Sequence, residues 1–179
     1  AEGNFGPQER VADNSPLRGG KSSSYEGGIR IPFLVMGPGV KPGSSTDTPI
    51  NLIDLFPTFM EIAGAAPRGD LELDGCDILP VIKGDSDEAK FADGTVRDTL
   101  YFTLPTGKSS ASTIRKGGWK LHLNHAPEDN GRPAMELFQL YHEDGSVADL
   151  GEKTNLIDTE PAKRDELLAD LNAWFKRFD

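Results

Sequence analysis

The sequence predicts a mixed α/β fold, in which an α/β segment is followed by a small antiparallel sheet with a helix packed on it. Three features lead to this prediction: a continuous apolar run, a stretch in which apolar and polar residues alternate, and a final segment with helical periodicity. The 179 residues include 20 glycines and 13 prolines, so loops should take up a large part of the chain.

The first half of the chain carries the α/β pattern. Residues 31–36 are apolar without interruption and are followed by Gly-Pro-Gly, which predicts a short strand buried on both faces. Residues 51–64 predict a helix with one apolar face, with Pro57 in its first turn and Gly64 at its end. Both elements are typical of a larger α/β domain.

A polar connection over residues 85–98 separates this pattern from the second half of the chain. We place the domain boundary within it. Residues 1–90 then belong to an α/β domain, and residues 91–179 form a small subdomain of their own.

The second half predicts the antiparallel sheet. Residues 100–104 predict a strand, residues 113–123 a hairpin, and residues 136–141 a further strand. Apolar and polar residues alternate in the second arm of the hairpin, which predicts a sheet covered on one face and solvent around Lys120 and His122. The chain ends in an amphipathic helix whose apolar positions are Leu167, Leu168, Leu171, Trp174, Phe175 and Phe178.

Composition limits the possible partners. The net charge of −10 argues against a nucleic-acid partner, because phosphate binding needs clustered Lys and Arg. No apolar run approaches the length of a membrane span, so we expect none. Cys76 is the single cysteine, which excludes an intrachain disulfide and a metal site built only from cysteines.

The stretch before the predicted strand is the most indicative of chemistry. Two glycine pairs, Gly19-Gly20 and Gly27-Gly28, bracket Lys21. Glycine lets the backbone approach a ligand closely, and lysine supplies a compact positive charge on a long stem. The pattern therefore predicts an anion-binding loop.

The same stretch carries a family resemblance. Its letters read PLRGGKSSSYEGGIRIPFLVMGPG, which is similar to the sulfatase pattern G-G-K-x-x-x-x-E-G-G-x-R-x-P followed by a strand and a Pro-Gly turn. Segments that resemble the family further along, in the same order, are residues 54–58, 73–84, 119–121, 136–140 and 152–156. The chain thus resembles the C-terminal portion of an arylsulfatase-type enzyme over nearly its whole length.

The resemblance implies part of an alkaline-phosphatase-like α/β sandwich over residues 1–90, followed by the small sheet and helix. Sulfatases hydrolyse organic sulfate esters of small molecules or glycans, with a formylglycine nucleophile made from Cys or Ser and a divalent cation, usually calcium. Lys21 matches the family lysine that binds the sulfate group, so it is the expected catalytic and substrate-binding residue. A periplasmic or secreted location is the expectation from the family.

Other parts of that machinery are missing from the sequence. Cys76 lacks the Pro and Arg that follow the family nucleophile, and Asp13-Asn14 stands too close to Lys21 to match the metal-binding pair. We therefore expect no metal ligand and no cofactor in these residues, with calcium and formylglycine supplied by a full-length parent. The 179-residue chain alone should be inactive, and its truncated core should favour self-association.

Two alternatives stay open at this point. The parent could be a phosphonate monoester hydrolase or a phosphodiesterase relative with the same loop. The chain could also be a non-catalytic binding or assembly module built on the small sheet and helix.

Several polar residues have simpler structural interpretations. Glu26 and Arg30, four residues apart, should form an ion pair that structures the loop together with its four glycines. Asp54 precedes a predicted helix and should cap it. Cys76 should be a packed thiol, and the three histidines should lie at the surface without a functional role.

Overall fold

The computed structural model divides the chain into two compact units. The residues that it describes are 13–66, 68–69, 71–105, 107 and 110–178. The first unit joins the chain up to residue 31 to the chain from residue 99 onward, and the second spans residues 32–98. The glycine-rich loop therefore lies in the same unit as the small sheet. The assignment of residues 1–90 to a larger catalytic domain concerns a longer polypeptide and stays a prediction.

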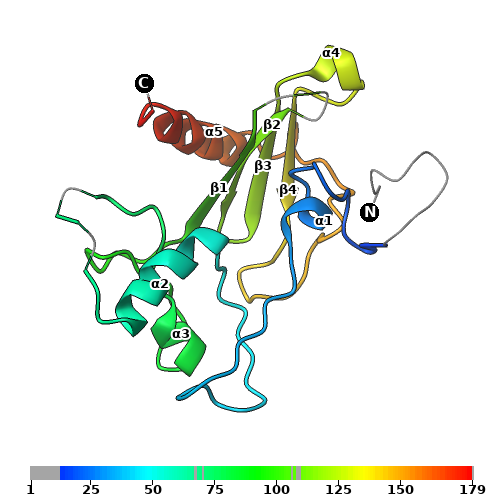
Figure 1. Ribbon diagram of the computed structural model, residues 1–179. Helices are drawn as coiled ribbons and strands as arrows, with labels where there is room; N and C mark the ends of the chain where they lie inside the picture. Colours follow the sequence, from blue (N-terminus) through cyan, green and yellow to red (C-terminus); the bar gives the residue numbers. More distant parts are fainter. Residues whose placement is uncertain (1–12, 67, 70, 106, 108–109, 179) are drawn as a thin grey trace. The chain divides into compact units, whose positions relative to one another are not determined.

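An antiparallel sheet forms the centre of the first unit, with its strands in chain order (Figure 1). The strands are β1 (Thr99–Leu104), β2 (Ala111–Lys116), β3 (Trp119–Asn124) and β4 (Met135–Gln139). The predicted hairpin is confirmed by β2 and β3, which turn through Gly117 at a φ of 54°. A short helix, α4 (Pro127–Asn130), lies in the connection from β3 to β4.

Helix α5 (Pro161–Phe175) covers one face of this sheet. Side chains that meet in its apolar core are Ile114, Leu121 and Leu137 from the sheet and Leu167 and Leu171 from the helix. All five are fully buried, and each contributes about 2 kcal/mol through removal of its side chain from water. The predicted sheet and C-terminal helix are thus confirmed, except that α5 ends before Phe178, whose predicted place on the buried face was wrong because it is 64% exposed.

The opposite face of the sheet is covered by residues 18–30, here called the N-terminal segment, which contain the short helix α1 (Glu26–Ile29). Tyr25 packs there against Phe138 of β4. Lys120 and His122, expected in solvent, are only 0% and 3% exposed. The prediction of a sheet covered on one face was wrong, because the polar side chains of this face meet aromatic and charged groups of the N-terminal segment in place of water.

The second unit is built around short helices. These are the 3-10 helix η1 (Leu52–Asp54), α2 (Leu55–Ile62) and α3 (Leu79–Lys83). The predicted helix is confirmed, and Gly64 follows its end at a φ of 63°. The small apolar core of this unit consists of Cys76, Ile78, Val81 and Ala89, so the prediction that Cys76 is a packed thiol is also confirmed.

Asp54 and Arg97 form a buried ion pair in this unit. The Asp54 carboxylate accepts hydrogen bonds from the backbone N–H of Asn51 (2.7 Å) and from that of Cys76 (2.9 Å). Arg97 Nη1 lies 2.5 Å from Asp54 Oδ1 and Nη2 lies 2.7 Å from Oδ2. The prediction that Asp54 caps the helix was wrong, because its side chain makes no cap bond to α2. Asn51 is the capping residue of η1, and Asp54 stands at the third helical position and bonds back to the Asn51 N–H.

The strand predicted over residues 31–36 does not form. Leu34 and Met36 are 90% and 94% exposed, and no described strand pairs with this segment. A strand needs a hydrogen-bonded neighbour, and an apolar run without one stays irregular whatever its composition. In the described part of the chain, no helix has the length and hydropathy of a membrane-spanning segment.

Candidate functional site

The glycine-rich segment closes on itself through its two glycine pairs. The Gly27 N–H donates to the Arg18 carbonyl (2.8 Å), and a Cβ on Gly27 would lie only 2.6 Å from that oxygen. A Cβ on Gly28 would lie 2.0 Å from the Ser23 carbonyl oxygen, and Gly19 has a φ of 75°. Glycine suits these contacts and this backbone conformation best, so Gly19, Gly27 and Gly28 are needed to bring the two ends of the loop together.

Lys21 lies on the exposed part of this closed loop. The preceding Gly20 is buried, whereas Lys21 and Ser22 are exposed, and Ser22 adopts a φ of 65°. Within the described residues, the Lys21 ammonium makes no hydrogen bond or ion pair. The loop thus presents a positive charge to solvent from a backbone whose ends are fixed, which suits the binding of an anionic oxygen.

A buried charged cluster lies behind the loop, formed by Glu26, Arg30, Lys120 and Glu152. Lys120 Nζ lies 2.9 Å from Glu26 Oε1 and 2.8 Å from Glu152 Oε1. Glu152 Oε2 accepts a hydrogen bond from the Glu26 backbone N–H (2.7 Å). The predicted Glu26–Arg30 ion pair is present at 2.5 Å, and Arg30 Nη2 also donates to the Tyr141 hydroxyl (2.8 Å).

The two carboxylates of the cluster titrate differently. Burial alone would raise the pKa of Glu26, but the adjacent Lys120 and Arg30 together bring that pKa below its ordinary value. Burial raises the pKa of Glu152 by more than Lys120 lowers it, so the net change for this group is upward. Glu26 is therefore the more firmly ionised partner of Lys120.

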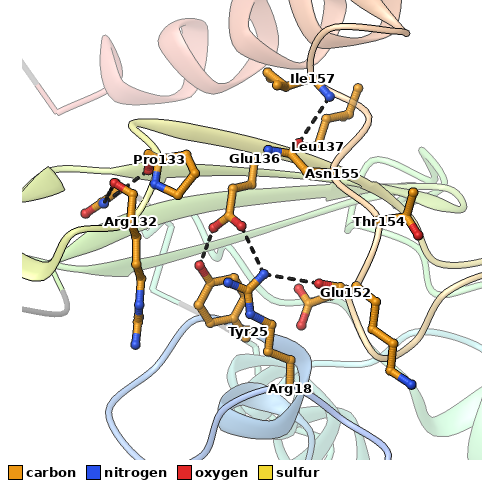
Figure 2. A network of polar contacts seen from close by, with 12 residues as sticks. Arg18, Tyr25, Arg132, Pro133, Glu136, Leu137, Glu152, Thr154, Asn155 and Ile157 are labelled. Atoms are coloured by element: carbon orange, nitrogen blue, oxygen red, sulfur yellow. Dashed lines mark hydrogen bonds and ion pairs between the residues drawn. The ribbon is translucent and has the colours of Figure 1, made fainter.

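Arg18 and Tyr25 join the other end of the loop to Glu136 of the sheet (Figure 2). The Arg18 guanidinium lies 3.9 Å above the centre of the Tyr25 ring, and the His122 ring stacks on Tyr25 at 4.6 Å. Tyr25 donates its hydroxyl hydrogen to Glu136, and Arg18 Nη1 lies 2.9 Å from Glu136 Oε1. Arg18 also donates to the backbone carbonyl of Glu152 (3.1 Å).

His122 corrects a prediction made from the sequence. Its ring is enclosed, and burial together with the neighbouring cations Lys120, Arg18 and Arg132 lowers its pKa to about 4, although Glu136 opposes them. The expectation of a surface histidine was wrong, because the N-terminal segment covers this face. His125 and His142 are exposed, as expected.

Sequence reasoning identified Lys21, Glu26 and Arg30 but missed the residues that anchor them. Lys120 looked like one polar position in an alternating strand, and Glu152 lay in a loop. One signal was available for both: each stands within a stretch that resembles the sulfatase pattern far from the glycine-rich loop.

The described residues do not form a metal centre. No group of three His, Cys, Asp or Glu side chains in this part of the chain is arranged to hold a metal ion. The Asp13 carboxylate instead accepts hydrogen bonds from the backbone N–H (2.9 Å) and hydroxyl (2.6 Å) of Ser15. The described residues therefore do not fit a calcium ion.

Comparison with known proteins places this loop in a family. A sequence model of the family described as Sulfatase matches residues 5–65, which include the whole closed loop. A sulfatase from Formosa agariphila is 32% identical over 176 residues, covering 90% of this chain and 30% of that protein. The chain belongs to the sulfatase family. Arylsulfatase K from Xenopus laevis is 31% identical over 150 residues, covering 82% of this chain and 26% of that protein.

Solved sulfatase structures share the fold. The crystal structure of Ps i-CgsB in complex with k-i-k-neocarrahexaose matches with a TM-score of 0.69 and 30% identity, over 91% of this chain and 32% of that one. A Bacteroides thetaiotaomicron protein, from a study of the metabolism of multiple glycosaminoglycans, matches with a TM-score of 0.66 and 26% identity, over 88% and 31%. The predicted alkaline-phosphatase-like fold is confirmed, and this sulfatase chain spans less than a third of the length of these relatives.

Proposed function

We propose that Lys21 is the sulfate-binding residue of an enzyme that hydrolyses organic sulfate esters. The observation that carries this proposal is an exposed ammonium, without a partner among the described residues, on a closed glycine loop within the segment that matches the sulfatase family. The sulfuryl oxygens carry negative charge, and further negative charge develops on the leaving oxygen as the ester bond breaks. A positive charge that is already fixed in place stabilises that state without having to reorganise.

The remaining machinery belongs, in this proposal, to other parts of a longer polypeptide. Cys76 is buried in the second unit and burial raises the pKa of its thiol to about 11, so it is a poor candidate for a nucleophile. Calcium would supply further positive charge to the sulfuryl group, and formylglycine would supply the nucleophile. The 179-residue chain alone is therefore expected to hydrolyse nothing.

We further propose a sulfated glycan as the substrate class. Support comes from two structural neighbours, one solved with k-i-k-neocarrahexaose and one from a study of glycosaminoglycan metabolism. A periplasmic or secreted location is part of this proposal, because a charged polysaccharide does not cross a membrane unaided.

The test uses the complete polypeptide that contains residues 1–179. Sulfate release is measured from 4-nitrophenyl sulfate and from a carrageenan oligosaccharide, for the wild type and for Lys21→Ala. The substitution should lower kcat/KM by about 10²–10³-fold, as does the loss of one charge-stabilising group in other enzymes. Lys41→Ala, at an exposed lysine of the second unit, is the matched control and should leave turnover unchanged.

Two results would count against the proposal. Wild-type kcat/KM in Lys21→Ala would remove Lys21 from the sulfate site. A kcat/KM for bis(4-nitrophenyl) phosphate above that for both sulfate esters would instead assign the protein to the phosphodiesterase or phosphonate hydrolase relatives.

A further inference from the structure

Glu152 contacts both ends of the loop that carries Lys21. Its carboxylate accepts the backbone N–H of Glu26 (2.7 Å), after the loop, and its backbone carbonyl accepts a hydrogen bond from Arg18 (3.1 Å), before it. These contacts join positions separated by 126 and 134 residues in the chain. Glu152 itself adopts a φ of 50°, in a region that non-glycine residues seldom occupy. The backbone there is held in an uncommon conformation by its surroundings.

Lys120 is what allows Glu152 to occupy this position. Glu26 and Glu152 bring two carboxylates to one fully buried place, and the Lys120 ammonium lies within 2.9 Å of both. With Arg30 on the outer oxygen of Glu26, the charged cluster contains two cations and two anions. Without Lys120, the carboxylates of Glu26 and Glu152 would repel each other, and the loop would lose its anchor.

Stability alone does not account for such a cluster. Well-packed apolar side chains of similar volume stabilise a fold as well as a buried ion pair does, or better, because buried charges lose their hydration. What the cluster adds is a defined geometry. Lys120 and Glu152 can both contact Glu26 in one arrangement only, and this arrangement fixes the position of the loop.

We propose that Lys120 and Glu152 are positioning residues of the sulfate site: they act through Glu26 and Arg18 to fix the loop that presents Lys21. This inference rests on the proposed role of Lys21 and adds to it two residues outside the segment that matches the family model.

The first measurement needs no substitution. Hydrogen exchange of the wild-type 179-residue chain is followed by NMR, amide by amide. Glu26 is the first residue of α1, where an amide has no acceptor within the helix and normally exchanges fast. We expect the Glu26 amide to exchange as slowly as amides of β3, because Glu152 accepts its hydrogen. Rapid exchange of Glu26 would overturn the inference.

The second measurement perturbs the cluster while keeping its charge balanced. The variant K120M/E152L removes one cation and one anion and leaves the Glu26–Arg30 pair intact. We expect the amides of Glu26, Gly27 and Gly28 to exchange at least about tenfold faster, while amides of β2 and β3 keep their rates. The conservative single variant Glu152→Gln retains an acceptor for the Glu26 amide, and this amide should therefore exchange nearly as slowly as in the wild type.

Lys116→Met is the matched control for this measurement. Lys116 lies in the same hairpin as Lys120 and pairs with Asp170 of α5 (2.7 Å), on the helix that covers the opposite face. Its loss should leave the loop amides unchanged. Equal acceleration of loop and strand amides in K120M/E152L would show a role in the fold as a whole and would overturn the positioning role.

Turnover of the complete polypeptide separates the two proposals. K120M/E152L should lower kcat/KM by about 10²-fold in the wild-type background, since a misplaced catalytic group costs that much, and by far less once Lys21→Ala is present. Equal losses in both backgrounds would refute positioning through Lys21. If Lys21→Ala alone leaves turnover unchanged, the proposed function fails, and the exchange rates alone decide whether Lys120 and Glu152 fix the loop.

Discussion

The stability of this chain should fall on mild acidification because of one histidine. His122 is enclosed between the sheet and Tyr25, and burial together with nearby cations holds its pKa at about 4, against an ordinary value of 6.5. The unfolded chain takes up a proton at His122 as the pH falls through 6.5, whereas the folded chain does not until about pH 4. Because the unfolded state binds more protons in this interval, the free energy of unfolding decreases as the pH falls.

The size of the effect follows from the two pKa values. At pH 7.5 both states hold a neutral ring, and the contribution is close to zero. At pH 5 the unfolded ring is almost fully protonated while the folded ring is not, which lowers the free energy of unfolding by about 2 kcal/mol. At pH 4 the decrease in the free energy of unfolding would approach about 3 kcal/mol. The comparison is made at pH 5 because this pH stays above the isoelectric point of about 4.8.

His122→Phe isolates this contribution. Phenylalanine keeps a ring against Tyr25 and does not titrate, whereas Glu26 and Glu152 titrate in both proteins and cancel in the comparison. Urea unfolding, followed by tryptophan fluorescence at pH 7.5 and pH 5, should show the wild type losing about 2 kcal/mol more than the variant. Equal losses, or an NMR titration of the His122 ring near pH 6.5 in the folded chain, would refute this reasoning.

Two further substitutions test the backbone and the buried ion pair. Gly28→Ala places a Cβ 2.0 Å from the Ser23 carbonyl, so the loop must open, and urea unfolding should show a loss of about 1–3 kcal/mol. Gly37→Ala has nothing within 4 Å of the new Cβ and serves as its control; equal effects would contradict the close packing. Arg97→Met leaves the buried Asp54 carboxylate without its cation and should cost about 3–5 kcal/mol, and a loss below about 1 kcal/mol would show that Asp54 is not dependent on it.

Local patterns predicted the elements that local physics determines. The β2–β3 hairpin follows from alternation around a Lys-Gly-Gly turn, and α5 follows from apolar residues at helical spacing. The Glu26–Arg30 ion pair was also accessible, because its partners are four residues apart. Each of these features depends on residues close together in the chain, so the sequence carries the whole signal.

The apolar run at residues 31–36 shows where such reasoning stops. Its composition is that of a buried strand, but a strand exists only when another strand supplies its hydrogen bonds. Helix α2 does form, but its apolar side chains at Phe59 and Ile62 are likewise exposed. Hydrophobicity indicates that covering a surface lowers the free energy, but it does not identify the segment that covers it.

The contacts that anchor the Lys21 loop could not be predicted from the periodicity of the sequence, for a related reason. An alternating strand is read as half solvent-facing because polar side chains are usually hydrated, and Lys120 fits that pattern as well as any surface lysine. A second segment that brings carboxylates of its own can replace the water, and the strand's sequence is then the same in either case. One partner of Lys120, Glu26, is 94 residues away in the chain, and only the fold brings them together. The candidate site therefore depends on two segments of the chain. A substitution on the face of β3 that the N-terminal segment covers should be detected first in the exchange of the loop amides.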